Sequence, residues 1–223
     1  MTLENQEQRR AAWVRPHMDW AAVENAKARL AGSADAVPRM IGDIDLTHLS
    51  HQFYAWWLEA RGTRIMPSPD DVSPRALVEL LPYMRYLSWE ENDRLVFRIY
   101  GSALAEATGL DLTGTDTFGD DIDYPGKAED KARIRLLHSH PCGLLLIREL
   151  RTPAGKPYLC ELMTLPVSGG SDGKDRIIGT VMARERMPDG EVDFKLSPPL
   201  TLRRAVFFDI GNGIPAAATD LGA

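Results

Sequence analysis

The hydrophobic pattern of this chain changes twice, and the order of those changes limits the folds it can adopt. Two β-rich runs, 83–91 and 94–101, are joined by a Glu-Asn-Asp turn and predict an antiparallel hairpin. Helical patterns follow at 102–109 and 126–140, and three more β-rich runs come after Pro141. Five antiparallel strands with helices between the second and the third predict an α+β fold with those helices on one face.

The later strands carry information about both faces of the sheet. The runs 144–147 (LLLI) and 177–183 (IIGTVMA) are apolar at odd and even positions alike. A sheet with one wet face would not tolerate this pattern, so both faces should be covered. The central helices would cover one face, and either the segment with Trp56 and Trp57 or a second copy of the chain would cover the other.

Two helices are expected before the sheet, at 19–32 and 48–62. The second helix presents several large rings, which are Phe53, Tyr54, Trp56 and Trp57. Aromatic residues dominate protein cores and are also enriched at the centres of interfaces. The sequence leaves both interpretations open, a buried core helix and a dimer interface.

Charge and hydropathy exclude several classes of protein. The 32 acidic residues outnumber the 26 basic ones, giving a net charge of -6, which argues against a general nucleic-acid binder. No apolar run approaches the roughly 20 residues of a membrane span, and the first thirty residues lack a secretory apolar region. The two cysteines make no disulfide framework. We therefore expect a cytoplasmic protein that binds neither nucleic acid nor membrane.

Several longer stretches carry a family resemblance. These are FYAWWLEARGTRIMPSPDDVSP, LLPYMRYLSWE, FRIYGSALAEATGLDLTG and the later Leu165-Pro166. Together they resemble a PAS domain, and more narrowly a stand-alone PAS-like family found mainly in alphaproteobacteria. The match spans about Leu49 to Arg186. It implies an α+β, PAS-like five-stranded antiparallel sheet, with short helices on one face and the N-terminal helices packed outside.

The resemblance also suggests how the chain is divided. Residues 1–47 would form an N-terminal extension with one helix, 48–187 the PAS-like domain with its leading helix, and 188–223 a partly mobile tail. The tail contains one more strand-like run, LRRAVFFDIG. Gly109 and Gly114 are interpreted as structural, because glycine adopts left-handed backbone conformations without strain.

In PAS domains a cleft between the sheet and the helices holds a small ligand or is filled by core. In the run PYLCELMTL, placing Glu161 outward puts alternate side chains on the inner face. The expected ligand-binding residues are Phe97, Ile99, Leu104, Tyr158, Cys160, Leu162 and Thr164. The ligand would be small and apolar or amphipathic, and the sequence specifies no cofactor.

Other chemistries have weaker support in the sequence. Haem ligation by His138 or His140 competes with simple roles at a helix C-terminus, and His48 with His51 lacks a third metal ligand. The acidic run at 116–123 lacks the spacing of a calcium loop. Flavin photochemistry of the light-sensing type needs a cysteine between Gly101 and Pro125, where there is none. No metal site, catalytic residue or enzymatic reaction is assigned.

The function expected from these observations is that of a sensory or regulatory PAS-like module. It would bind a small ligand or a protein partner and signal through a helical surface or as a homodimer, since most soluble oligomers are symmetric dimers. The alternative is a structural interaction module with a filled core and no ligand.

Overall fold

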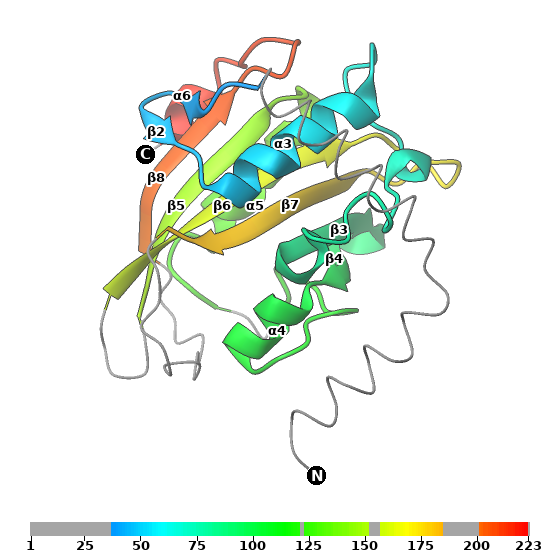
Figure 1. Cartoon of the computed structure of the whole chain (residues 1–223). Coiled ribbons are helices and arrows are strands. Elements are labelled where there is room, and N and C mark those ends of the chain that lie inside the picture. Colours follow the sequence, from blue (N-terminus) through cyan, green and yellow to red (C-terminus); the bar gives the residue numbers. More distant parts are fainter. Residues whose placement is uncertain (1–36, 121–122, 152–156, 185–200, 223) are drawn as a thin grey trace.

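A six-stranded antiparallel sheet forms the centre of the computed structural model, which describes residues 37–120, 123–151, 157–184 and 201–222 (Figure 1). The strand order is β4-β3-β7-β6-β5-β8. The strands are β3 (Met84–Glu90), β4 (Arg94–Tyr100), β5 (Gly143–Arg151), β6 (Pro157–Val167), β7 (Arg176–Ala183) and β8 (Thr201–Phe208). The helix expected at 19–32 lies outside the described residues.

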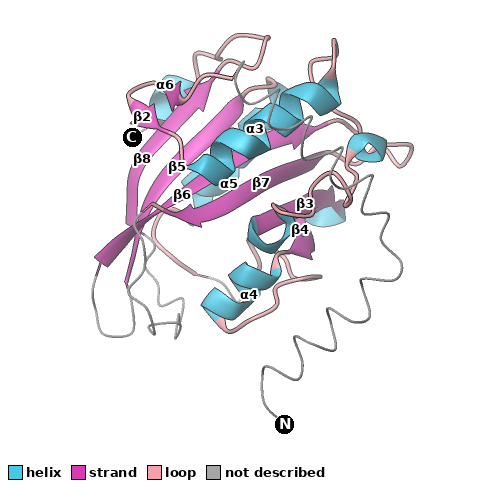
Figure 2. Ribbon diagram, in the orientation of Figure 1, coloured by secondary structure: helices cyan, strands magenta, loops and turns pink. Residues whose placement is uncertain are grey.

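Two short strands and several helices complete the described fold (Figure 2). A small hairpin pairs β1 (Met40–Ile41) with β2 (Ile44–Asp45). The helices are α3 (His48–Arg61), α4 (Ser102–Thr108), α5 (Lys127–Ser139) and α6 (Ala218–Leu221), with 3-10 turns η2 (Pro69–Asp71), η3 (Leu81–Tyr83) and η4 (Glu91–Asp93). Among the helices of these ranges, none combines the length and the apolar character that a bilayer span requires.

The first hairpin forms where the sequence predicts it. β3 pairs with β4 in antiparallel register, and η4 supplies the Glu-Asn-Asp connection. Asn92 and Asp93 both have positive φ angles, 59° and 63°, which Asn and Asp tolerate better than most residues. The same hairpin contains an irregularity, because Tyr86 pairs with Ile99 while Leu87 pairs with Phe97. Arg98 is therefore an extra residue on β4, as in a β-bulge.

The helix α3 begins and ends with regular caps. The Thr47 hydroxyl accepts a hydrogen bond from the backbone N–H of Ser50, and Gly62 ends the helix with a φ of 56°. One side of the helix carries Phe53 and Trp57, both fully buried. The helix packs across β6 and β7 on one face of the sheet (Figure 1).

The aromatic residues of α3 are core residues of this chain. Phe53, Tyr54, Trp56 and Trp57 are between 0% and 6% exposed and pack against the sheet. Trp57 Nε1 donates to the Pro166 carbonyl at 3.0 Å, so even its polar atom is satisfied. Of the two interpretations left open by the sequence, the core therefore applies, and these rings offer no surface for a dimer.

Both faces of the sheet are covered, as the apolar strand patterns predict. Leu145 and Ile147 of β5 join the core under α3, which we call the α3 face. Leu144 and Leu146 join a second core with Ile134 and Leu137 of α5, on the α5 face. Alternate positions of one strand thus serve two separate cores, because successive side chains of a strand point to opposite sides.

The sheet has one strand more than expected. The run interpreted from the sequence as part of a partly mobile tail contributes β8, which pairs antiparallel with β5 from Gly143↔Phe208 to Glu149↔Thr201. Phe207 and Phe208 are buried on opposite faces of the sheet. The five strands predicted from the sequence end before residue 187. The strand β8 lies far along the chain from its neighbour β5, and the local pattern does not reveal which strand such a run pairs with.

Gly109 has the structural role predicted from the sequence. It ends α4 in the left-handed region with a φ of 68°, and nothing lies within 4 Å of where a side chain would start. The constraint is therefore the backbone conformation and not lack of space. Gly114 has a φ of 86° in the loop that follows, with the same open surroundings.

Candidate functional site

The structure brings most of the predicted ligand-binding residues to the α5 face. Cys160, Leu162 and Thr164 alternate along β6 with residues of the α3 face, so they share one side of the sheet together with Tyr158. Leu162 packs against the core that contains Phe97. Cys160 pairs with Arg148 of β5.

Two predicted residues are placed elsewhere. Ile99 was expected beside Phe97, but the extra residue Arg98 changes the alternation of β4 between them, and Ile99 lines a cavity on the α3 face. Leu104 is 8% exposed on α4, and that helix contacts η3. A β-bulge has no simple signature in the sequence, so strict alternation gave the wrong face for Ile99.

Glu161 lies on the face of β6 opposite Cys160 and Leu162, as predicted, but its burial was not foreseen. It is fully buried beneath the start of α3. One carboxylate oxygen accepts from the backbone N–H and the hydroxyl of Thr47, at 3.0 and 2.7 Å, and the other pairs with Arg184. A charge can be buried when it is paired and hydrogen-bonded, and here the partners come from segments distant in sequence.

The sequence analysis also missed a partly buried arginine on this face. Arg85 of β3 pairs with Gly179 of β7, and Gly179 pairs with Thr164 of β6. The three residues therefore lie side by side across the sheet. Gly179 has no side chain, and Arg85 Nη2 reaches beyond it to donate to Thr164 Oγ1 at 2.5 Å. The side chain is partly exposed as a whole, but Arg85 Nε is buried and has no hydrogen-bond partner.

A carboxylate with three donors lies near Arg85 on the same face. Asp130 of α5 accepts from Arg148 at 2.5 and 2.6 Å, from Arg133 at 2.8 Å and from the Tyr124 hydroxyl at 3.0 Å. Asp130, Arg133 and Arg148 are each less than 10% exposed. Two arginines thus share this carboxylate inside the protein.

The electrostatics of the α5 face are those of a cationic interior. Burial, followed by the charge of Arg148, lowers the pKa of Arg85 to about 10, so the guanidinium stays charged at neutral pH in an unfavourable environment. Burial also raises the pKa values of Tyr124 and Tyr158, which keeps both hydroxyls neutral. The arrangement therefore offers hydrogen-bond donors and positive charge to any group that could enter.

Three of the four histidines considered as ligands contact backbone carbonyls. Nε2 of His138 donates to the Arg176 carbonyl at 2.7 Å, and burial lowers the pKa of this ring. His140 contacts the Asn212 carbonyl at 2.9 Å, and His51 contacts the Val37 carbonyl at 3.1 Å. In the part of the chain that the structure describes, no three His, Cys, Asp or Glu side chains gather so that they could hold a metal ion.

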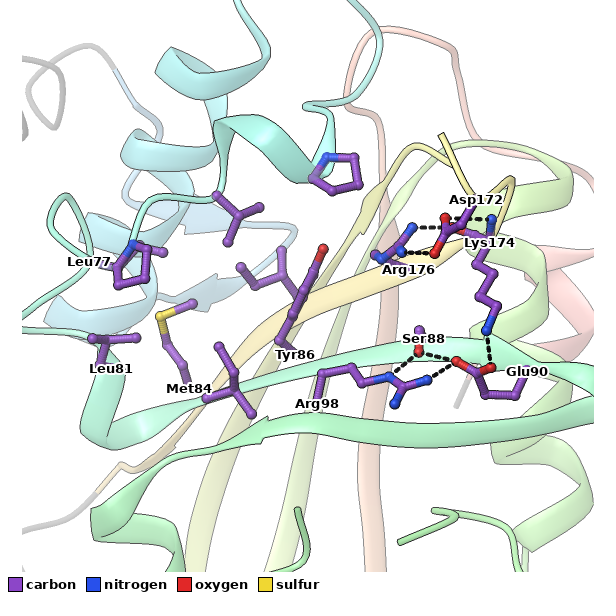
Figure 3. A pocket seen from close by; sticks show the side chains of 15 residues that line it. Leu77, Leu81, Met84, Tyr86, Ser88, Glu90, Arg98, Asp172, Lys174 and Arg176 are labelled. Atoms are coloured by element: carbon purple, nitrogen blue, oxygen red, sulfur yellow. Dashed lines mark hydrogen bonds and ion pairs between the residues drawn. The ribbon is translucent and has the colours of Figure 1, made fainter. Parts of the chain in front are cut away.

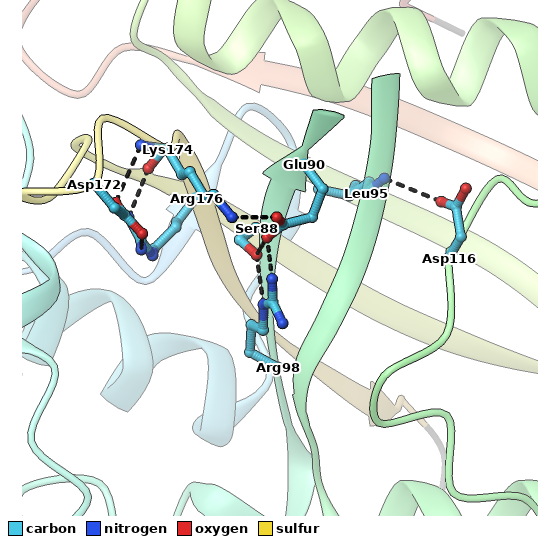
Figure 4. Close-up of polar contacts among 8 residues, drawn as sticks. All are labelled: Ser88, Glu90, Leu95, Arg98, Asp116, Asp172, Lys174 and Arg176. Atoms are coloured by element: carbon cyan, nitrogen blue, oxygen red, sulfur yellow. Dashed lines mark hydrogen bonds and ion pairs between the residues drawn. The ribbon is translucent and has the colours of Figure 1, made fainter. Parts of the chain in front are cut away.

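The cysteines and the acidic loop also have structural explanations. Burial raises the pKa of Cys142 to about 11 and of Cys160 to about 12, so neither thiol ionises readily. Asp116 of the acidic run accepts from the backbone N–H groups of Leu95 and Phe118, at 3.0 and 3.1 Å. This carboxylate thereby fixes the loop against the edge strand β4, as Figure 4 shows for Leu95.

On the opposite, α3 face the structure contains a cavity of about 370 Å³ (Figure 3). The segment from Pro69 to Leu81 covers it, and strands β3, β4 and β7 form its floor. One end is apolar, and the other carries charged side chains. The lining includes Val72, Met84, Tyr86, Glu90, Arg98 and Ile178.

This architecture is that of a known protein family. A model of the PAS domain family matches residues 46–182, which is more than half of the chain. An antiparallel sheet with short helices on one face and a leading helix on the other defines the class of fold, and the family model identifies it. The chain belongs to the PAS domain family. The narrower resemblance to a stand-alone alphaproteobacterial group stays a prediction.

The chain is similar to several solved structures at low identity and low TM-score. The Rhodobacter sphaeroides LOV protein is 17% identical, with 49% of this chain and 62% of that chain covered and a TM-score of 0.35. An RNA-binding light-oxygen-voltage receptor is 15% identical over 80% of this chain and 62% of its own, with a TM-score of 0.35. A fungal LOV domain photoreceptor is 15% identical, covering 45% and 73%, with a TM-score of 0.31.

The chain covers less than two thirds of the first Rhodobacter chains it matches, 62% to 65% of their length. No curated protein matches it. The family assignment therefore depends on the PAS domain model, and these comparisons assign no ligand.

Proposed function

We propose that this protein is a sensory PAS module that recognises a small amphipathic acid on the α5 face of its sheet. The observation that carries the proposal is Arg85, whose Nε is buried without a hydrogen-bond partner beside a second arginine, Arg148. A buried polar group without a partner is costly, and a buried charge more so. An acid group of a ligand would satisfy both the donor and the charge.

The residues around Arg85 support this class of ligand. Thr164 presents a neutral hydroxyl, while Leu162 and Cys160 continue the same strand face with apolar surface. A carboxylate at the guanidinium and an apolar body along β6 would match this sequence of groups. Arginine also binds carboxylates through two parallel hydrogen bonds, which would orient the ligand.

Signalling would follow from a change in packing and not from catalysis. A ligand shifts an equilibrium only by its unequal affinity for two arrangements of the protein. Asp130 of α5 is bonded to Arg148 of β5, so a ligand anion near Arg85 and Arg148 would compete with the contact that holds this helix to the sheet. Movement of α5 would then be read by a protein partner.

The proposal keeps three further expectations from the sequence: a cytoplasmic location, a signalling partner and a homodimer. The aromatic rings of α3 cannot form the dimer interface, because they are buried within the chain. Within the described residues β8 is an edge strand with a strand neighbour on one side only, and such edges pair readily with other strands.

The test measures thermal stability in the presence of matched acids and amides. We expect benzoate and 3-phenylpropionate to raise the melting temperature, and their uncharged amides to have a much smaller effect. Binding at one hundred times Kd stabilises a protein by about 2.7 kcal/mol, which such a measurement detects easily. Native mass spectrometry of the purified protein would show a retained acid and the number of subunits in the same spectrum.

The variant for this test is Arg85→Met, which should abolish the difference between acid and amide. The matched control is Arg98→Met, which removes one positive charge from the other face of the sheet and should keep the difference. Equal shifts by benzoate and benzamide in the wild type, or an unchanged preference in Arg85→Met, would refute the acid site. A monomer in the mass spectrum would refute the homodimer alone.

A further inference from the structure

The cavity on the α3 face lies on the opposite side of the sheet from Arg85 and Thr164. Its apolar end is formed by Leu77, Leu81 and Met84, and Ile178 of β7 contributes to the floor. Leu77, Met84 and Ile178 are 2% exposed or less, so this end of the cavity is part of the folded core. A volume of about 370 Å³ falls at the lower end of the range of small-molecule sites, roughly 300–1,000 Å³.

One polar atom in this lining lacks a partner. The hydroxyl of Tyr86 is buried and forms no hydrogen bond in the structure. Figure 3 shows the ring rising from β3 between the apolar end and the charged end, with its oxygen directed toward the covering segment. Burial raises the pKa of Tyr86, so the group stays a neutral hydrogen-bond donor. A buried hydroxyl with no acceptor costs about 1–3 kcal/mol.

The charged groups at the other end already have partners. Glu90 accepts from Ser88 at 2.7 Å and pairs with Arg98 and Lys174 (Figure 4). Arg176 pairs with Asp172 at 2.5 Å. Each charge of this end therefore has an opposite charge beside it, and an ionic ligand would have to break one of these pairs to gain a contact.

We propose that this cavity is a second binding site, for a neutral and largely apolar molecule with one carbonyl oxygen that accepts a hydrogen bond from Tyr86. The paired charges argue against an acid or an amine, and the unsatisfied hydroxyl argues against a pure hydrocarbon. Ring ketones, lactones and quinones have this chemistry. The site is separate from the acid site of the proposed function, because its lining residues face the other side of the sheet.

The test uses three bicyclic probes of similar size with different polar character: 1-tetralone, the hydrocarbon tetralin and 1-naphthoate. Binding is followed by the NMR signals of methyl groups that line the cavity, those of Met84, Ile99 and Ile178. We expect 1-tetralone to shift these signals and to bind about fivefold more tightly than tetralin, the factor that one net hydrogen bond supplies. The carboxylate 1-naphthoate should bind more weakly than the ketone.

Two variants separate the hydroxyl from the volume. Tyr86→Phe keeps the ring and should make the affinities for 1-tetralone and tetralin equal, without destabilising the ligand-free protein. Val72→Phe places a larger side chain in the cavity and should weaken both neutral probes. The matched control is Tyr83→Phe, on η3 and outside the cavity lining, which should retain the preference for the ketone.

Three results would overturn the proposal. The ketone and the hydrocarbon would bind the wild type equally, or Tyr86→Phe would keep the preference for the ketone. Alternatively, the probes would shift the methyl signals of Leu144 and Leu162 and leave those of the cavity unchanged, which would place them on the α5 face.

Discussion

The two faces of this sheet bury different kinds of side chain, although the same strands supply both. On the α3 face, Phe53, Trp56 and Trp57 form an aromatic core, and the buried carboxylate Glu161 is bonded at its edge to the start of the helix. On the α5 face, arginines and Asp130 lie inside the protein among aliphatic residues. The aromatic core serves to hold the fold, whereas buried charge is poorly explained by stability alone.

This difference supports the proposal that the α5 face changes its packing when a ligand binds. A close-packed aromatic core has few alternative arrangements, because changes of even one methylene disturb it. A cluster of paired charges can exchange one partner for another when an ion enters. We therefore propose that α3 supports the fold and that α5 carries the response to a ligand, and the following experiments test that division.

The largest effect is expected from Trp57→Ala. This side chain is fully buried and donates to the Pro166 carbonyl, so its loss should lower the free energy of unfolding by about 4 kcal/mol. Urea denaturation measures the change. The control Leu110→Ala, at a residue 58% exposed, should stay within about 0.5 kcal/mol. If Trp57→Ala cost less stability than Asp130→Ala, the conclusion that α3 is the main support of the fold would be wrong.

The second prediction concerns Asp130→Ala. Removing this carboxylate leaves Arg133 and Arg148 buried near each other without it, and the expected cost is about 3 kcal/mol. Added formate should recover part of the lost melting temperature in the variant and little in the wild type, since it can occupy the vacated position. Formate that acts equally on both proteins would contradict a cationic interior on the α5 face.

The third prediction compares two buried threonines on opposite faces. Thr164→Val removes the acceptor of Arg85 and should cost about 2 kcal/mol, because a buried charged donor is left unpaired. Thr180→Val removes only a contact with the Ser50 hydroxyl at 3.5 Å and should cost less than about 1 kcal/mol. Equal costs would show that polar groups on the two faces contribute alike.

The smallest effect is expected at Glu90, at the edge of the α3 face. Lys174, followed by Ser88 and Arg98, lowers the pKa of this carboxyl from 4.5 to about 2 in the folded protein. The extra stability is therefore complete above about pH 5 and is lost as the pH falls from 4.5 toward 2. In Glu90→Gln this part of the acid sensitivity should disappear, at a cost below about 1 kcal/mol near neutral pH. If Glu90→Gln lost as much stability as the wild type between pH 4.5 and 2, the prediction would be wrong.

The sequence predicted the local elements well and the long-range contacts poorly. The helix 48–62, the hairpin with its Glu-Asn-Asp turn and the left-handed Gly109 all follow from residues close together in the chain. The pairing of β8 with β5, by contrast, joins residues about sixty positions apart, and no local preference encodes it.

The site shows the same limit more sharply. Alternation placed Thr164, Leu162 and Cys160 on one face, but it could not show that Arg85 from another strand would reach Thr164. It placed Glu161 on the outward face but could not show that the carboxylate would be buried there, since acids are seldom fully buried unless paired. Only the approach of Thr47 and Arg184 made its burial affordable.

The sequence by itself determined the antiparallel sheet and its two covered faces, because an apolar residue at every position of a strand cannot meet water on either side. The tertiary structure decided which charges lie inside and which hydroxyl is left without a partner. The reason is physical: hydrophobic pattern acts along one strand, whereas the cost of burying Arg85, Asp130 or Tyr86 depends on atoms brought from other strands and helices.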